Sequence, residues 1–513
     1  MSLLLPVVVF APAIAAFLLL AIPDSQKAAT RAVSLLGATI SLLGSIKVAL
    51  DYDRSAGGLQ MGYDLPLLPT LGIHLNLAVD GWGASLLLLT GIIIFAAVLA
   101  SFTVARRDKE FFIYLLVLVS GVFGVFVAQD LLIFFLLYEI AVLPMYLLIG
   151  IWGSSNKVAE DGPFRYVWSL LDVGGREYAA MKLTLMLLMG SAAILVGIFW
   201  LYLEAGATSF DLAELARHEY AEPTQLIVFP LFWLGFGTLA GVFPFHTWSP
   251  DGHASAPTAV SMLHAGVLMK LGAFGVMRVG MVLLPEGTHA WAPIVGAVAV
   301  INVVYGAFSA MSQKDLKYIV AYSSVSHMGV VMLGAATLDS TAWNGAVFQM
   351  FAHGVMTGLL FALVGLIYER SHTRIIATMG GFGSVMPVVA LFFTLACLSS
   401  LGLPGTAGFV AEMMVFLGAW RVGHPIWAIA GIVGAFVTAV YVLRASRTIF
   451  WGPGPSEKFE HLHDAHGSEL VAPIVLGAAI VVFGVWPRLI LDLIDPSTSA
   501  NLAVITRVIG GGQ

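Results

Sequence analysis

The sequence contains one cysteine, Cys397, among 513 residues. A single thiol cannot form an intrachain disulfide, a four-cysteine iron–sulfur cluster or a zinc site built from several thiolates. Charged residues are also scarce, at 11% of the chain, where an average soluble domain has about 25%. A water-soluble fold and electron transfer through a cluster in this chain are therefore not expected.

Long apolar runs, in contrast, are abundant. Hydrophobic residues make up 59% of the chain. Runs of about 20 residues, enough to cross a hydrocarbon core of about 30 Å, recur almost to the end of the sequence. The longest polar stretches, at residues 51–80, 153–178, 204–224 and 452–468, are short enough to be loops. We expect one all-α, polytopic membrane domain over residues 1–513.

The apolar runs predict fourteen membrane-spanning helices. Residues 3–22 lack the basic segment of a signal peptide and are interpreted as the first span. The spans are expected at residues 3–22, 31–49, 82–104, 110–128, 130–152, 179–203, 225–245, 258–282, 290–311, 315–336, 342–368, 383–421, 424–447 and 469–488.

Two of the predicted helices are interrupted. The seventh runs into Phe-Pro-Phe-His at residues 243–246, and the twelfth contains Leu-Pro-Gly-Thr at residues 403–406. Proline removes a backbone donor and clashes with the preceding turn. The breaks lie five spans apart, which suggests a five-helix unit over residues 110–282 and an inverted copy over residues 290–447. Unwound backbone at membrane depth indicates an ion path.

Basic residues fall mainly on one set of loops. Because Lys and Arg are retained on the cytoplasmic side, that face is expected to be cytoplasmic, with both termini on the periplasmic side of a bacterial inner membrane. Of the 24 Lys and Arg, the following lie on this face: Lys27, Arg31, Arg106, Arg107, Lys109, Lys157, Arg165, Arg176, Lys182, Lys314, Lys317, Arg370, Arg374, Arg444, Arg447 and Lys458.

Glu139 and Lys270 lie deep in the fifth and eighth predicted spans. An ionisable residue at such depth is costly and is by default a functional candidate. The structural alternatives are a protonated glutamic acid bonded between helices and a lysine that serves as a fixed counter-ion. Burial disfavours each charged form and a neighbouring opposite charge favours it, so a residue balanced between the two can take up and release a proton.

Other polar residues occupy mid-span positions. His327 and His353, in the tenth and eleventh spans, could relay protons between waters, although each alone is as readily a core histidine. Glu412 follows the break in the twelfth span, where a proton exit would be placed. His264 precedes Lys270 by six residues, roughly 240° around a helix of about 3.6 residues per turn, so the two should face different neighbours.

Two histidine-containing segments allow more than one interpretation. The loop before the last span could bind a metal, but a solvated loop is favoured because no cysteine or helical spacing holds its ligands. We expect no metal and no cofactor in this chain. After the seventh-span break, three residues could line a cavity, and helix capping explains the aspartate almost as well. The loop residues are His461, His463, Asp464 and His466, and the others are His246, Asp251 and His253.

Four segments together resemble a known family. They are residues 314–329 (KDLKYIVAYSSVSHMG), 349–354 (QMFAHG), 368–374 (YERSHTR) and 401–412 (LGLPGTAGFVAE). They resemble the antiporter-like subunits of respiratory complex I, most closely the chain M type, the counterpart of mitochondrial subunit 4. The resemblance covers nearly the whole chain, and motifs of this length are specific.

The resemblance implies fourteen helices in two inverted five-helix repeats, with the seventh and twelfth helices broken. It implies a non-redox subunit that moves protons while NADH reduces quinone elsewhere in the complex. Flavin, iron–sulfur clusters and quinone would belong to partner subunits. The partners would be other membrane-arm subunits and the lipid bilayer, with no nucleic acid. The residues that match the family's proton-transfer positions are Glu139, Lys270, His327, His353 and Glu412.

One expected residue is missing. The family usually pairs the fifth-helix glutamate with a seventh-helix lysine, seven residues before the histidine of the Pro-x-His motif. Counting back from His246 leads to Leu239. His264 is a second departure and resembles the eighth-helix histidine of the related chain L. We hypothesise that His264 or Lys182 takes part of the missing lysine's role beside Glu139.

Two other functions remain open. A subunit of a multi-subunit sodium/proton antiporter would share this fold and the glutamate and lysine positions. The amino-acid sequences of residues 317–327 and 368–374, however, favour complex I. A scaffold with inactive half-channels is the third possibility, and Leu239 is the one feature in its favour. Bound flavin and iron–sulfur signals in the purified complex would separate the first two.

Overall fold

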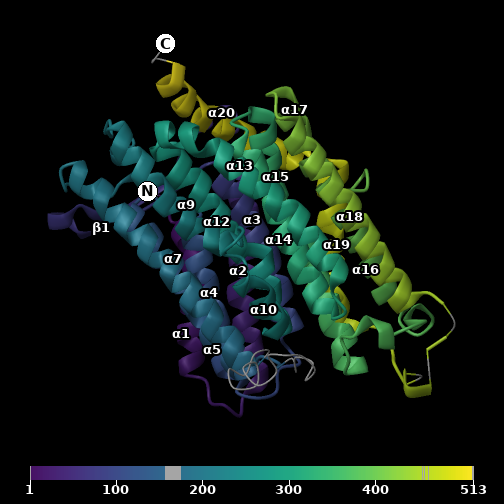
Figure 1. Ribbon diagram of the computed structural model, residues 1–513. Helices are drawn as coiled ribbons and strands as arrows, with labels where there is room; N and C mark the ends of the chain where they lie inside the picture. The colour runs from purple at the N-terminus through teal and green to yellow at the C-terminus, as the bar shows by residue number, and fades with distance from the viewer. Residues whose placement is uncertain (1, 156–174, 453, 456, 460, 511–513) are drawn as a thin grey trace.

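The computed structural model describes residues 2–155, 175–452, 454–455, 457–459 and 461–510. Its long helices lie side by side and run between the upper and lower ends of the molecule as drawn in Figure 1. Two basic residues counted above, Lys157 and Arg165, lie outside the described residues. The other predicted elements can be compared directly with the structure.

In the first half of the chain, each predicted span except the eighth is a single helix. They are α1 (Leu4–Leu20), α2 (Lys27–Asp51), α3 (Gly81–Ala100), α4 (Asp108–Val125), α5 (Leu131–Trp152), α7 (Arg176–Glu204) and α9 (Glu222–Ala240), with the short helices α8 (Leu212–Leu215) and α10 (Trp248–Ser255). The eighth span consists of α11 (Thr258–Leu263), η2 (His264–Leu268), α12 (Met269–Gly275) and η3 (Val276–Met281).

The second half begins with three long helices and ends in a helix that was not predicted. Its helices are α13 (Pro285–Ser312), α14 (Leu316–Ala336), α15 (Ser340–Ser371), α16 (Pro387–Ser400), α17 (Ala407–Arg421), α18 (Pro425–Phe450), α19 (Val471–Val485) and α20 (Arg488–Gly510). Short 3₁₀ turns lie at Ile376–Thr378, Phe382–Ser384, Glu457–Phe459 and Gly467–Leu470.

Each of the predicted spans coincides with a helix or a broken pair of helices. Within the described residues, 11 helices are long and apolar enough to cross a membrane. The remaining predicted spans correspond to α1, to α4 and to the α16–α17 pair. The helical membrane fold is therefore confirmed, with little sheet. The division into repeats at residues 110–282 and 290–447 stays a prediction.

Both predicted helix breaks are present. Helix α9 stops at Ala240, and Gly241 follows in the left-handed conformation with φ 76°. Helix α16 stops at Ser400, and the chain passes through Gly402 (φ 74°) and Gly405 (φ 91°) before α17 begins. Left-handed backbone is readily adopted by glycine alone. These glycines therefore let the chain unwind and restart inside the bundle.

The eighth span is the most enclosed helix and is not a regular α-helix. Its whole apolar window is buried within the described structure, and π-helical segments η2 and η3 flank the α12 turns that carry Lys270. A π-helix bonds residue i to i+5 and often occurs at functional sites. The sequence predicted the span but not this local widening.

Two elements outside the membrane spans were missed. Strands β1 (Gln60–Leu68) and β2 (Ile73–Val79) pair as an antiparallel hairpin around the 3₁₀ turn Pro69–Leu71, within the expected loop 51–80. Helix α20 lies across the upper end of the bundle (Figure 1). It is amphipathic, with Ile490, Leu493 and Ile494 buried, so it lacks the continuous apolar run used to find spans.

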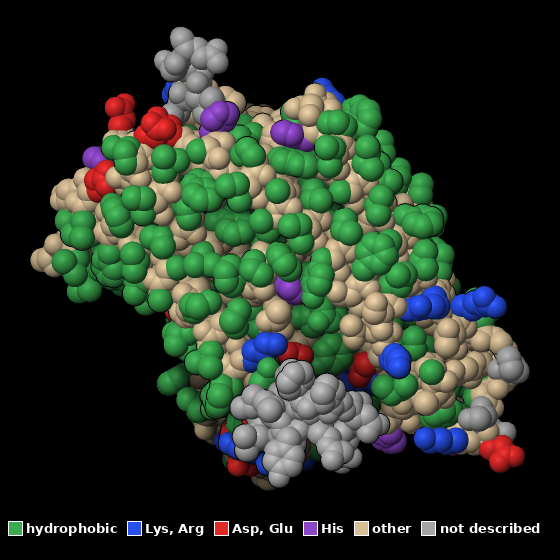
Figure 2. Space-filling view, viewed as in Figure 1, with side chains coloured by type: hydrophobic (Ala, Val, Ile, Leu, Met, Phe, Trp, Pro, Cys, Tyr) green, Lys and Arg blue, Asp and Glu red, His purple; other side chains and the backbone are tan. Residues whose placement is uncertain are grey.

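The two ends of the bundle differ in charge. Figure 2 shows apolar side chains over most of the visible face and most of the Lys and Arg near its lower end. Helices α3, α5 and α15 all end there, and this end is called the basic end below. An apolar belt between polar ends is the surface expected of a protein surrounded by lipid.

Candidate functional site

Lys270 lies at the centre of the bundle and contacts the second half of the chain. Its side chain is 0% exposed, and Nζ lies 2.6 Å from Nδ1 of His353 on α15. Nζ also donates to the backbone carbonyl of Ala265 in the π-helical segment η2. The buried amine is therefore bonded to one fixed acceptor and to one group that can carry a proton.

His353 leads on to His327 and Glu412. The ring centroids of His353 and His327 are 5.2 Å apart, and Nδ1 of His327 lies 3.1 Å from Oε1 of Glu412. All three residues are at least 95% buried. The four groups, called the relay below, form a buried series in which the two histidine rings approach each other without a direct hydrogen bond in the described structure: Lys270, His353, His327 and Glu412.

His327 Nδ1 has a partner in either protonation state. The Glu412 carboxylate accepts from it when it carries a proton, and the Gln349 amide, 3.1 Å away, donates to it when it does not. The other ring nitrogen lies 3.2 Å from Ser400 Oγ at the end of α16. Since a neutral imidazole has one donor and one acceptor nitrogen, both tautomers are accommodated.

The break between α16 and α17 positions Glu412. A Cβ on Gly402 would lie 2.9 Å from Glu412 Oε2, and Gly402 has φ 74°. Glycine at this position lets the unwound chain approach the carboxylate. An open apolar groove of about 540 Å³ adjoins the same carboxylate and is lined by Leu401, Phe409, Met413 and Trp420 among others. The Glu412 end of the relay therefore lies close to an open groove on the lateral surface of the helix bundle.

Glu139 lies apart from the relay. It is partly exposed on α5, next to the exposed residues Leu136 and Ile140, and it accepts a hydrogen bond from Ser191 of α7. Leu239, at the position of the missing lysine, is 1% exposed. Among the described residues, no hydrogen bond or ion pair joins Glu139 to the relay.

Lys182 contacts a different carboxylate. Its Nζ lies 2.7 Å from Oδ2 of Asp251 on α10, whose Oδ1 accepts from the Tyr318 hydroxyl at 2.9 Å. On α7, Lys182 and Ser191 are separated by roughly 13 Å, at about 1.5 Å per residue. In the described structure Lys182 is thus paired with Asp251 at another level of the bundle from Glu139.

His264 packs against a histidine that was not among the predicted proton-transfer residues. Its ring centroid lies 4.0 Å from that of His253 on α10 and 5.0 Å from that of Trp248. The expectation that His264 and Lys270 face different neighbours is confirmed. Neither ring nitrogen of His253 or His264 has a hydrogen-bond partner among the described residues. His253 is 0% exposed, and its place beside the helix break was its only sequence signal.

The histidines of the last loop do not form a cluster suited to a metal. Within the described residues, no group of three or more His, Cys, Asp or Glu is placed to hold one. Asp464 accepts from the backbone N–H groups of Val388 (2.6 Å) and Val389 (3.2 Å). Its carboxylate therefore caps the start of α16, as acidic side chains do at helix N-termini.

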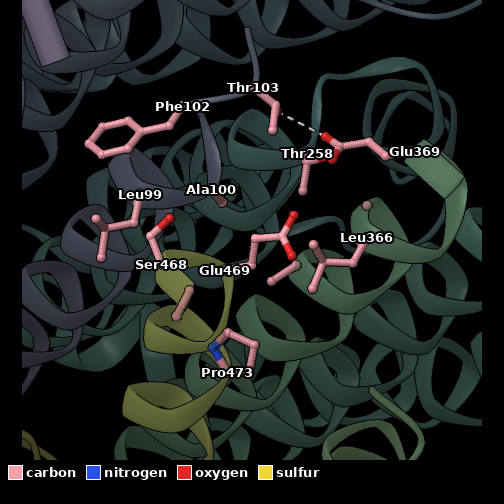
Figure 3. Close-up of a pocket in the computed structure, with 13 residues that line it drawn as sticks. Leu99, Ala100, Phe102, Thr103, Thr258, Leu366, Glu369, Ser468, Glu469 and Pro473 are labelled. Carbon is pink, nitrogen blue, oxygen red and sulfur yellow. Dashed lines mark hydrogen bonds between the residues drawn. The ribbon is translucent and has the colours of Figure 1, made fainter. Parts of the chain in front are cut away.

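A small cavity lies at the basic end, between the ends of α3 and α15 and the start of α19. It encloses about 60 Å³, enough for water. Figure 3 shows Glu369, Glu469 and Thr258 around it, with Thr103 Oγ1 donating to Glu369 at 3.0 Å. Thr258 is the first residue of α11, which leads to His264. A few polar groups thus face a mainly apolar, water-sized space next to the eighth span.

Two broken helices and a buried chain of titratable side chains define a class of membrane protein built to move ions. Residues 128–438 match the family described as NADH:quinone oxidoreductase/Mrp antiporter, TM. The chain belongs to this family. It is 35% identical, over 97% of its length and 91% of the relative's, to NAD(P)H-quinone oxidoreductase chain 4 2 of Thermosynechococcus vestitus. It is 36% identical to chain 4 1 of Synechococcus elongatus, with the same coverage of both chains.

Solved structures share the fold. A chain of respiratory complex I from Thermus thermophilus superposes with a TM-score of 0.86 at 28% identity, covering 98% of this chain and 99% of that one. A chain of the Mrp complex from Dietzia sp. gives a TM-score of 0.81 at 20% identity, covering 98% of each chain. The second similarity supports the fold alone. The resemblance of the sequence to antiporter-like subunits is confirmed.

Proposed function

We propose that this chain is a proton-translocating membrane-arm subunit of an NADH:quinone oxidoreductase, and that it moves protons while partner subunits reduce quinone. The relay of Lys270, His353, His327 and Glu412 is the observation that carries the proposal. The names of the most similar relatives and the likeness to complex I from Thermus thermophilus support the same complex.

In this proposal, protons pass between side chains that are held out of bulk water. The basic end faces the cytoplasm of a bacterial cell, and both termini lie on the periplasmic side of its inner membrane. The cavity beside Glu369 is large enough for water, and in this proposal it is the entrance to the eighth span. Lys270 exchanges its proton with His353, and Glu412 releases it beyond the second helix break.

The energy required at each step is modest. Moving one proton against about 100 mV costs about 2.3 kcal/mol. One pKa unit corresponds to about 1.36 kcal/mol, so a swing of roughly two units in one relay group is enough. Redox chemistry in partner subunits, which hold the flavin, iron–sulfur clusters and quinone, supplies that swing. This chain is then a non-redox subunit of the translocating enzyme.

A tagged form of this chain, purified in its native complex, tests the proposal. We expect flavin and iron–sulfur absorption, and proton uptake or release when NADH and a quinone are added to reconstituted vesicles. Lys270→Met should abolish most translocation. Lys47→Met is the matched control, because Lys47 is an exposed lysine paired only with Asp51. Quinone reduction with no proton movement in the unmodified complex would overturn the proposal.

A sodium/proton antiporter subunit is the second candidate. The family match, whose description also names the Mrp antiporter, is the observation in its favour. In that case the purified complex would lack flavin and iron–sulfur signals. A sodium gradient across the vesicle membrane would then drive a pH change without NADH, and this result would replace the first proposal with the second.

A further inference from the structure

Two of the long sequence motifs lie against each other at the basic end. Leu316 N–H donates to the Arg374 carbonyl at 2.8 Å, and Ile376 N–H donates to the Lys314 carbonyl at 3.0 Å. Arg374 Nε lies 3.2 Å from Asp315 Oδ2. The segment that begins α14 and the segment that follows α15 are thus joined by backbone bonds and an ion pair. None of these residues belongs to the relay.

The basic side chains of this pair turn toward the first half of the chain. Arg374 Nη1 donates to the Ala254 carbonyl at 2.7 Å, and Lys317 Nζ donates to the Ala256 carbonyl at 2.6 Å. Lys317 is 5% exposed and Arg374 is 9% exposed. Burying a cation is costly unless it is compensated. Here the compensation includes carbonyls at the C-terminal end of the half-helix α10, where the helix dipole favours positive charge.

The end of α10 is fully bonded by these and other donors. The last carbonyls of a helix have no partner within it and need one elsewhere. Besides the two cations, Ser154 N–H donates to Ser255 O at 2.8 Å and Ser261 Oγ donates to His253 O at 2.9 Å. Because the two cations come from the second half of the chain, the position of this half-helix depends on that half.

His253 lies just before the two residues whose carbonyls the cations bind. Arg374 holds the carbonyl of the next residue, and Lys317 holds the carbonyl three residues on. The His253 ring packs against the ring of His264 at a tilt of 43°, with 4.0 Å between the ring centroids. His264 belongs to the same span as Lys270. Any shift of α10 therefore moves a fully buried titratable ring beside the centre of the bundle.

We propose that Lys317 and Arg374 are positioning residues that hold the half-helix α10 and thereby place His253 for proton transfer between the two halves of the chain. The proposal rests on the proposed function above. It gives Lys317 and Arg374, which lie in the motifs at residues 314–329 and 368–374, a role distinct from that of the relay. Neither cation transfers the proton itself.

The hold of Lys317 and Arg374 on the end of α10 is called the clamp below. Three variants in the native complex test it. Lys317→Met removes the charge and the donor, Lys317→Arg keeps both, and Lys314→Met alters an exposed lysine three residues earlier in the same motif. We expect translocation per quinone reduced to fall at least tenfold in Lys317→Met, to recover at least half in Lys317→Arg, and to be unchanged in Lys314→Met. Hydrogen exchange at residues 248–256 should accelerate only in Lys317→Met.

A double variant separates positioning from a general structural role. If Lys317 acts through His253, adding Lys317→Met to His253→Ala should lower translocation no further than His253→Ala alone, because changes that act through one group are not additive. Fully additive losses would overturn the proposal. So would normal translocation and normal exchange in Lys317→Met while Lys270→Met is inactive, a result that leaves the proposed function intact.

Assembly is measured first, by the amount of intact complex. If Lys317→Met does not assemble, Lys317→Gln replaces it, because the amide keeps a donor and loses the charge. Slower translocation with faster exchange at α10 in Lys317→Gln supports the clamp. An assembled Lys317→Gln complex that is unchanged in both measurements overturns it. If the unmodified complex moves no protons, the proposed function fails rather than the clamp.

Discussion

At the residue scale, the five positions matched to the family divide into a connected set and an isolated one. Lys270, His353, His327 and Glu412 are linked by contacts that run from the first half of the chain into the second. Glu139 has Ser191 as its partner instead of a cation. The sequence could identify these residues by their depth in apolar helices, but only packing between helices shows which of them meet.

Glu139→Gln tests the isolated position. The amide keeps the shape of the side chain and cannot exchange a proton, so we expect translocation to fall by about 10²-fold or more, the usual contribution of a positioned acid or base. Ser191→Ala removes one hydrogen bond worth about 1 kcal/mol and should have a smaller effect. Rates are measured as vesicle acidification per quinone reduced.

The control for Glu139→Gln is Glu177→Gln, which changes an exposed glutamate on α7 that is bonded to Arg176. It should pump normally. His264→Ala belongs to the same experiment. If Glu139→Gln and His264→Ala both assemble and leave pumping unchanged, the hypothesis that His264 compensates for Leu239 is abandoned. Lys182 is already paired with Asp251, so its effect is expected through α10 instead of through Glu139.

Gly402→Ala tests the approach of the second break to Glu412. The left-handed backbone costs an alanine about 1–2 kcal/mol, and the new Cβ would lie 2.9 Å from Glu412 Oε2. We expect lower thermal stability and slower translocation. Gly423→Ala is the matched control, because Gly423 has φ 84° and open space around its Cβ position. Gly423→Ala should lose stability but not translocation. An equal loss of translocation in both variants would contradict the prediction.

At the element scale, α20 holds several spans together at the end of the bundle opposite the basic end. Ser497 Oγ accepts from Gly81 N–H at 2.9 Å, Thr498 Oγ1 accepts from the Trp82 indole at 3.0 Å, and Asp495 accepts from Asn344 at 2.6 Å. The helix therefore joins the starts of α3 and α15. Its amphipathic sequence cannot show which spans it crosses, because that depends on how the bundle is arranged.

Gly81→Ala tests this contact. A Cβ on Gly81 would lie 1.6 Å from the Leu493 carbonyl, so α20 must move. Overpacking of this kind typically costs about 1–3 kcal/mol. We expect a lower melting temperature in detergent and faster proteolysis within residues 488–510. Gly380→Ala, where the added Cβ meets nothing within 4 Å, serves as the control. Unchanged proteolysis of α20 would show that the contact is dispensable.

At the scale of the whole molecule, the distribution of basic residues predicts which end faces the cytoplasm. The single native cysteine makes this testable, because Cys397 is 2% exposed and can be replaced by alanine. In that background, Leu59→Cys should react with a membrane-impermeant maleimide on intact cells. Arg107→Cys, at the basic end, should react only after the cells are opened. The reverse labelling would invert the predicted orientation.

The sequence alone determined the class of fold and the depth of the titratable residues, because the length of an apolar run and the position of a proline are local properties of the chain. It also placed both helix breaks. The tertiary structure decided which side chains meet. Lys182 against Asp251 and the two basic motif residues against the end of α10 are contacts between helices far apart in sequence. His253 and His264 lie closer in sequence, but they meet only because the chain turns back between α10 and the eighth span. Such contacts depend on how the helices pack, which no single segment encodes.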